Sequence, residues 1–154
     1  MKTKLLVLAA LSLGIATSAS AQMKPEDAIK YRKAGYNFMA WNMGKIKAQV
    51  VDGAVPFNKD QIVAAANLIA ATANSGMGAL YPAGSDKDAG DQKTRVKPEF
   101  FQQQDKVKEL AVAYVKEANE LAKVAATGDQ AAIKAQFGKT GESCKACHDK
   151  FRKD

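Results

Sequence analysis

The sequence has few of the residues from which catalytic sites are usually built. Its 154 residues include one histidine, two cysteines and one tryptophan. Paired carboxylates, a nucleophile beside a base, and a glycine-rich phosphate loop do not occur at the spacings that catalysis requires. We therefore do not expect an enzyme.

Long hydrophobic runs are also missing after the first 21 residues. Residues 1–21 combine Lys2 and Lys4, an apolar run over 5–15 and the small residues Ala19-Ser20-Ala21. This order is typical of a secretory signal peptide cleaved after Ala21, and the apolar run is shorter than a membrane-spanning helix. An uncleaved membrane anchor is the alternative. We expect one exported, soluble domain over residues 22–154, without a membrane contact.

The net charge of +7 is not concentrated in a basic cluster. The 23 lysine and arginine residues are spread along the chain among 16 acidic residues, and no nucleic-acid-binding motif accompanies them. Solvated helix faces account for this pattern, so we expect no nucleic-acid partner. The positive charge is compatible with a weak preference for acidic protein partners.

Strand patterns and internal repeats are absent, and the hydrophobic residues follow a helical period. From Pro25 to Val50 they recur at alternating three- and four-residue steps, as in a bundle helix. Asn58 and Asp129 are expected to cap later helices. The sequence predicts an all-α fold, a four-helix up-down-up-down antiparallel bundle, with helices over about 25–50, 59–75, 98–128 and 129–151. The connection 81–97 is long for a small domain, which makes it either functional or mobile.

Residues 144–148 form the motif that carries most chemical information. Cys144 and Cys147 are three apart and His148 follows directly, which is the attachment pattern of c-type haem. On a helix both thiols lie on one face, within reach of the two vinyl groups of a porphyrin, and the imidazole can bind the iron. A disulfide in so short a loop is strained, a thioredoxin-like pair needs a βαβ context, and zinc needs a fourth ligand. We predict one covalently attached haem c near one end of the bundle and, because such haem is attached outside the bacterial cytoplasm, a periplasmic protein.

The predicted helix 25–50 has a second apolar face beside its inward one. This face carries Tyr31, Phe38 and Trp41, and it is either a subunit interface or packed inside the monomer. Arg32 is the one charge on the inward stripe. Its guanidinium either reaches water past a packed stem or pairs with a buried anion such as a haem propionate.

The chain resembles the class II cytochromes c, and within them the cytochromes c′. The resemblance covers residues 23–154. It depends on Lys24-Pro25-Glu26-Asp27, on Tyr31-Arg32 with Tyr36 and Met39, on residues 76–81, and on the motif 144–148 followed by Phe151-Arg152. Class I cytochromes c share the haem motif, but they place it near the N-terminus of a smaller fold and supply a methionine later in the chain.

The resemblance implies roles for the residues of the motif and for two arginines. Cys144 and Cys147 would form the thioether bonds, and His148 would be the axial iron ligand. Arg152 would lie beside the face of the haem that His148 binds. Arg32 would hold a propionate. We also expect a homodimer formed through the first two predicted helices, 25–50 and 59–75.

The position four residues after Arg32 faces the open side of the iron in this family. Low-spin relatives have a methionine ligand there, whereas this chain has Tyr36, so we expect five-coordinate, high-spin iron. A protonated phenol is a poor ligand, since its reference pKa is about 10. Met39 is one turn further on, and it either packs against the ring or closes the sixth position.

The resemblance implies a periplasmic haem protein that binds small gases such as NO and CO and is capable of electron transfer. A neutral diatomic enters an apolar pocket more readily than a charged ligand, and Tyr36 would act as its gate. The alternative is a dedicated low-spin electron carrier to a respiratory or photosynthetic partner. A connection over 81–97 could then cover an exposed haem edge.

Overall fold

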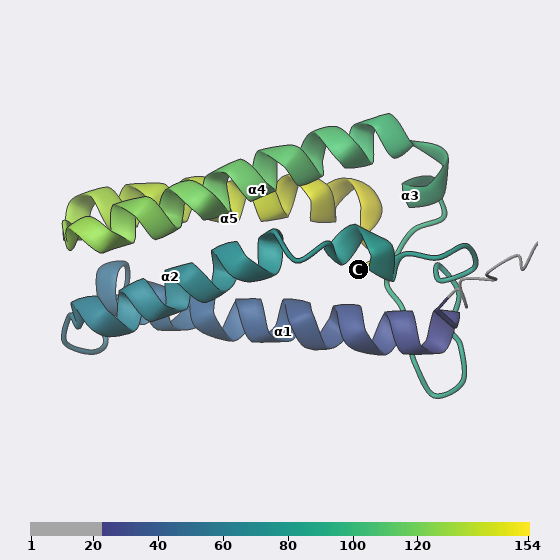
Figure 1. Cartoon of the computed structure of the whole chain (residues 1–154), viewed down its shortest axis with the longest axis horizontal. Helices are drawn as coiled ribbons and strands as arrows, with labels where there is room; N and C mark the ends of the chain where they lie inside the picture. The colour runs from purple at the N-terminus through teal and green to yellow at the C-terminus, as the bar shows by residue number, and fades with distance from the viewer. Residues whose placement is uncertain (1–22) are drawn as a thin grey trace, which may run out of the picture.

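The computed structural model describes residues 23–154, so the predicted signal peptide 1–21 lies outside the described residues. Four long helices form the fold: α1 (Pro25–Val50), α2 (Lys59–Ala73), α4 (Gln104–Thr127) and α5 (Gln130–Phe151). In Figure 1, α1 and α2 make the lower pair and α4 and α5 the upper pair, and successive long helices run in opposite directions. The predicted all-α, up-down-up-down bundle is confirmed. Among the described residues no helix is long and apolar enough to cross a membrane.

Local capping explains where three of the long helices begin. α1 starts at Pro25, where a proline loses no hydrogen bond, and acidic residues follow in the first turn. The Asn58 side chain accepts a hydrogen bond from the backbone N–H of Gln61 at 3.0 Å, and Asp129 accepts one from Ala132 at 3.0 Å. Both predicted N-caps are therefore confirmed. Gly128 ends α4 with φ of 78°, a left-handed conformation that glycine adopts without strain.

The predicted single helix over 98–128 is wrong at its start. The chain forms a short helix α3 (Glu99–Gln102), and Gln103 then departs from helical geometry with φ of −117° and ψ of 52°. The break turns Phe100 inward, where its ring stacks on Tyr81 at 4.4 Å and meets Phe151 edge-on at 5.7 Å. Helical periodicity cannot reveal such a break, because its cause is contact with residues far away in the sequence.

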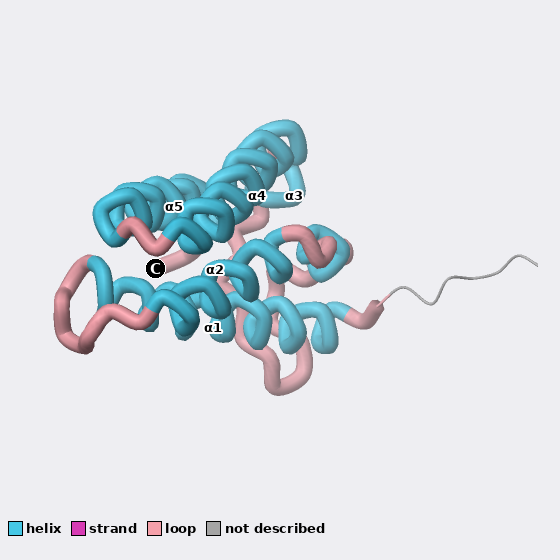
Figure 2. Tube along the Cα trace, turned by 60° about the vertical axis from the view of Figure 1, so that its left-hand side comes forward, coloured by secondary structure: helices cyan, strands magenta, loops and turns pink. Residues whose placement is uncertain are grey.

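The second predicted helix ends slightly early. α2 stops at Ala73, Asn74 takes the C-cap position, and Gly76 adopts a left-handed φ of 80°. A short 3₁₀ helix, η1 (Met77–Leu80), then leads into the 81–97 segment. Figure 2 shows the connecting loops in pink against the cyan helices.

The main apolar cluster of the core occupies one half of the bundle. Ala-rich α2 packs closely against α4 there, and isoleucine and leucine side chains from all four long helices are fully buried, each stabilising the fold by about 1.5–3 kcal/mol. The core residues come from the C-terminal halves of α1 and α4, from α2 as far as Ile69 and from the N-terminal half of α5, mostly on the left side of Figure 1. They are Ile46, Val50, Ile62, Ala65, Ala66, Ile69, Ala118, Leu121, Ala125 and Ile133.

The 81–97 segment is tied to two parts of the bundle. Its end pairs with the C-terminus of the chain, since the Lys97 N–H donates to the Phe151 carbonyl at 2.9 Å and the Lys153 N–H donates to the Arg95 carbonyl at 2.7 Å. Its middle is bonded to Arg32 of α1. The segment is therefore an ordered part of the wall at the end of the bundle where α5 ends.

Candidate haem-binding site

The half of the bundle opposite the main apolar cluster contains a large cavity. Its volume is about 920 Å³, and its walls come from α1, α2, η1, α4, α5 and the 81–97 segment. Most of the lining side chains are apolar, which suits a flat, largely apolar macrocycle. The apolar and aromatic ones include Tyr36, Met39, Met43, Ile69, Tyr81, Phe100, Val107, Leu110, Tyr114, Val115, Phe137 and Phe151.

The motif 144–148 lies on the α5 wall of this cavity. Cys144, Cys147 and His148 all contribute to the lining, and both thiols are free and partly buried. Burial raises the pKa of the Cys144 and Cys147 thiols, so both are neutral near pH 7. Two reduced thiols one helical turn apart, with an imidazole beside them, are the groups that a covalently held haem needs. No cluster of three or more metal-ligating side chains, as zinc would need, occurs within residues 23–154.

The His148 imidazole is held in its neutral form. Burial is the main cause that lowers its pKa, and the nearby guanidinium groups of Arg152 and Arg95 lower it further. Arg152 Nη1 lies 3.3 Å from His148 Nδ1. A neutral imidazole keeps one ring nitrogen with a lone pair, which is the form in which histidine binds metals.

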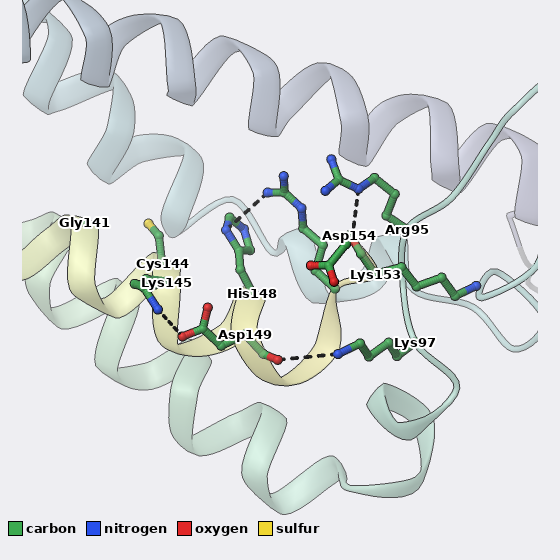
Figure 3. A pocket seen from close by; sticks show the side chains of 10 residues that line it. Arg95, Lys97, Gly141, Cys144, Lys145, His148, Asp149, Lys153 and Asp154 are labelled. Atoms are coloured by element: carbon green, nitrogen blue, oxygen red, sulfur yellow. Dashed lines mark hydrogen bonds and ion pairs between the residues drawn. The ribbon is translucent and has the colours of Figure 1, made fainter.

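A second, more open hollow of about 530 Å³ shares Cys144, His148 and Arg152 with the cavity. Figure 3 shows that His148 and Cys144 project from α5 beside it. Its rim is mostly basic, and the acidic side chains there are Asp149 and Asp154. Asp149 pairs with Lys145 on the same helix. The basic side chains are Arg95, Lys97, Lys145, Arg152 and Lys153.

Tyr36 of α1 lies in the cavity wall and is paired with a second tyrosine. The Tyr81 hydroxyl donates a hydrogen bond to the Tyr36 oxygen at 3.3 Å. Tyr36 lines the cavity and is 40% exposed. Burial raises the pKa of Tyr36 above its usual value, while the hydrogen bond from Tyr81 works in the opposite direction. The phenol is thus protonated near neutral pH, the form in which it is a poor iron ligand.

Met39 lies one turn further along α1 and is buried. Its Sδ accepts a hydrogen bond from the Tyr114 hydroxyl on α4 at 2.9 Å. Burial raises the pKa of Tyr114, so this phenol keeps the proton that it donates. Met39 therefore lies in the cavity wall with its sulfur directed to a neighbouring helix.

Arg32 is also buried in the cavity wall, and it bonds the 81–97 segment. Nη1 donates to the Leu80 carbonyl at 3.2 Å and to Ser85 Oγ at 2.8 Å. Nη2 donates to the Ser85 carbonyl and to Thr94 Oγ1. The predicted contact with a haem propionate stays a prediction, and the structure gives Arg32 a second task, that of fixing this segment.

Comparison with known proteins shows to which protein family the chain belongs. The family model described as cytochrome c′ matches residues 27–152. The cytochrome c′ of Allochromatium vinosum is 56% identical over 143 residues, which cover 92% of this chain and 91% of the relative. That of Rhodocyclus tenuis is 57% identical over 130 residues, with 84% and 96% covered. A solved cytochrome c′ described as having an unusual ligand-controlled dimer dissociation is 55% identical, with a TM-score of 0.83 and coverage of 87% of this chain and 100% of that one.

The chain belongs to the cytochrome c′ family.

Cytochromes c′ bind a single covalently attached haem c, and this chain therefore binds one. The cavity fits that cofactor in three respects: its apolar lining, its two neutral thiols on one helix face, and its neutral imidazole beside them. The predicted family and cofactor are confirmed.

Sequence reasoning missed several partners of the predicted site residues. The hydroxyl groups of Tyr81 and Tyr114 bind Tyr36 and Met39, and Ser85 and Thr94 bind Arg32. Tyr81 belongs to the sequence 76–81 that carries the family resemblance, which was a usable signal. Ser85 and Thr94 lie in a polar connection, where nothing in the pattern distinguishes them from solvent-facing neighbours.

Proposed function

We propose that the chain is a gas-binding haem protein whose iron is five-coordinate and high-spin. Cys144 and Cys147 form the thioether bonds and His148 is the axial ligand. Haem c supplies the iron at which NO or CO binds. The observation that carries this proposal is the hydrogen bonding of the α1 wall: Tyr36 is paired with Tyr81, and the Met39 sulfur is paired with Tyr114. Both α1 side chains that we predict to lie near the iron are thus engaged by neighbouring phenols.

Tyr36 acts as the gate in this proposal. Its ring faces the cavity from α1, and its protonated hydroxyl is also a potential donor to a bound diatomic. The apolar lining penalises charged ligands, because a charge that enters the cavity loses its hydration. Arg32 binds a propionate at the cavity wall, and Arg152 holds the imidazole from the solvent side.

We propose that the protein forms a homodimer through α1 and α2. Tyr31, Phe38 and Trp41 are exposed on α1 and do not pack inside the monomer. The rings of Phe38 and Trp41 stack at 5.6 Å, and Lys45 Nζ lies 3.4 Å from the centroid of the Trp41 ring. Exposed aromatic surface of this kind is typical of a protein interface. Since Tyr36 lies on the same helix, a ligand that displaces its ring can disturb the dimer.

The protein is exported to the periplasm after cleavage of residues 1–21, and it acts as a binder rather than as an enzyme. The sequence of the N-terminal segment and the attachment of haem c outside the cytoplasm support this location. The single histidine, placed beside the thiols on α5, leaves no second imidazole for acid–base chemistry on the opposite side of the haem.

Electron transfer is the second candidate function, and the basic hollow beside His148 favours it. Five lysine and arginine side chains surround the place where the chain's haem-binding helix meets solvent. Such a rim attracts an acidic redox partner and raises its association rate at low salt. A dedicated carrier would use low-spin, six-coordinate iron, which is the point on which the two functions differ.

Absorption and electron paramagnetic resonance spectra of the purified holoprotein, with and without NO or CO, test the proposal. We expect a high-spin ferric spectrum and a five-coordinate ferrous spectrum that changes on addition of CO. A low-spin ferrous spectrum that does not change on addition of CO would overturn the proposed gas binding and favour a dedicated electron carrier.

A further inference from the structure

Tyr81 reaches Tyr36 from a different part of the chain. It follows η1, 45 residues after Tyr36, and the two hydroxyl oxygens are 3.3 Å apart, with Tyr81 as the donor. Both rings line the cavity. A phenol can rotate about its side-chain bonds, and a hydrogen bond to its oxygen selects one orientation.

The Tyr81 ring is itself held by two groups. It stacks on Phe100 with centroids 4.4 Å apart and an interplanar angle of 22°. The guanidinium carbon of Arg32 lies 4.7 Å from the same ring's centroid. Stacking and cation–π contacts of this kind both favour a single ring position.

The groups that hold Tyr81 are fixed in turn. Arg32 is 3% exposed and donates hydrogen bonds to the backbone or side chains of Leu80, Ser85 and Thr94. Phe100 meets the ring of Phe151 edge-on at 5.7 Å, at the last residue of α5. Tyr81 therefore stands on a rigid support, whereas Tyr36 lines the cavity.

We propose that Tyr81 is a positioning residue that holds the Tyr36 phenol in its blocking orientation over the cavity. The inference rests on the proposed role of Tyr36 as the gate. A gas molecule that enters must break the hydrogen bond between the two phenols before the Tyr36 ring can move. The activation free energy of gas entry thus includes the free energy of breaking this hydrogen bond, in addition to the cost of displacing the bulky ring.

The substitution Tyr81→Phe tests the inference, because it removes the hydroxyl and keeps the ring on Phe100 and Arg32. We expect the association rate of CO with the ferrous holoprotein to rise about fivefold, the factor that one ordinary hydrogen bond supplies. Thr72→Val is the matched control, since it removes a hydroxyl that donates to Leu68 within α2, and it should leave the rate unchanged.

A double variant separates positioning from a general structural effect. Since Tyr81 acts only through Tyr36, Tyr36→Ala alone and Tyr36→Ala with Tyr81→Phe should bind CO at the same rate. A further rise in the double variant would overturn the inference. The same holds if Tyr36→Ala speeds CO binding and Tyr81→Phe does not, a result that would leave the gate itself intact.

A measurement without any gas tests the contact between Tyr81 and Tyr36 even if the proposed role of Tyr36 as the gate is wrong. Ultraviolet resonance Raman spectra of the ferric holoprotein should show a shifted Tyr36 band in Tyr81→Phe, assigned by its loss in Tyr36→Phe. If Tyr36→Ala leaves the CO rate unchanged, the proposed gate is wrong, and the shifted band still supports the hold of Tyr81 on Tyr36. An unshifted band would overturn that hold.

Discussion

The Tyr114 hydroxyl donates a hydrogen bond to Sδ of Met39, 2.9 Å away, and so joins α4 to α1 across the cavity wall. Thioether sulfur is a weak acceptor, so the pairing is informative about where the methionine points rather than about stability. Met39 is the methionine of α1 that lies one turn after Tyr36, toward the C-terminal end of the helix.

Removal of this hydrogen bond should change the spin state of the iron. In Tyr114→Phe the Met39 sulfur is released, and we expect a low-spin fraction in the ferrous absorption spectrum that the unchanged protein lacks. The double variant with Met39→Leu should return the spectrum to high-spin, because it removes the sulfur. A purely high-spin Tyr114→Phe protein would contradict the idea that Tyr114 keeps Met39 from the iron.

Replacement of the gate should speed gas binding. We expect Tyr36→Ala to raise the CO association rate about tenfold, equal to about 1.4 kcal/mol of the barrier. It should also weaken any dissociation of the dimer on CO binding, since no ring is displaced against α1. Flash photolysis and sedimentation velocity measure the two effects. Tyr36→Phe keeps the bulk of the ring and so separates steric blocking from the contribution of the hydroxyl. If Tyr36→Ala bound CO at the same rate as the unchanged protein, the proposed gate would be refuted.

The aromatic face of α1 can be tested by one charge. Trp41 is 57% exposed, and we expect Trp41→Glu to give a monomer in sedimentation velocity at concentrations where the unchanged protein is dimeric, because the substitution removes the indole ring and puts a carboxylate that must be desolvated in its place. Val112 on α4 is the matched control, being 61% exposed and apolar but on another helix. Val112→Glu should leave the dimer in place, and a dimeric Trp41→Glu protein would place the interface elsewhere.

The buried phenols should make the fold sensitive to alkali. Burial raises the pKa of Tyr36, Tyr81 and Tyr114 above the usual value. These groups therefore keep their protons in the folded protein at a pH where the unfolded chain has lost them, so the unfolded state binds fewer protons and stability falls as pH rises. The free energy of unfolding in urea should be unaffected by these phenols below about pH 10 and decline above it. Tyr81→Phe should reduce the slope of that decline, and an equal slope would show that Tyr81 is not involved.

Much of this architecture could be predicted because its causes are local. The helix starts at Asn58 and Asp129 depend on side chains within three residues of the backbone groups that they cap. The motif 144–148 can be identified from the sequence for a similar reason, since covalent attachment to one porphyrin fixes the spacing of its residues.

The remainder depends on contacts between distant residues. Arg32 finds its partners 53 and 62 residues away, in Ser85 and Thr94. The helix break at Gln103 serves Phe100, whose ring must reach Tyr81 and Phe151. Periodicity describes which side of a helix is apolar, but it carries no information about which polar loop residue folds back onto an inward-facing arginine.

The confinement of the dry apolar core to one half of the bundle has a consequence for maturation. The half built from Ile46, Ile62, Leu121 and Ile133 is packed by its own side chains. The half around Cys144 and Cys147 has a hollow where side chains would otherwise interlock. We therefore expect the core-bearing end of the bundle to be the better packed end before haem attachment, and the cavity-bearing end to gain packing when the ring fills it.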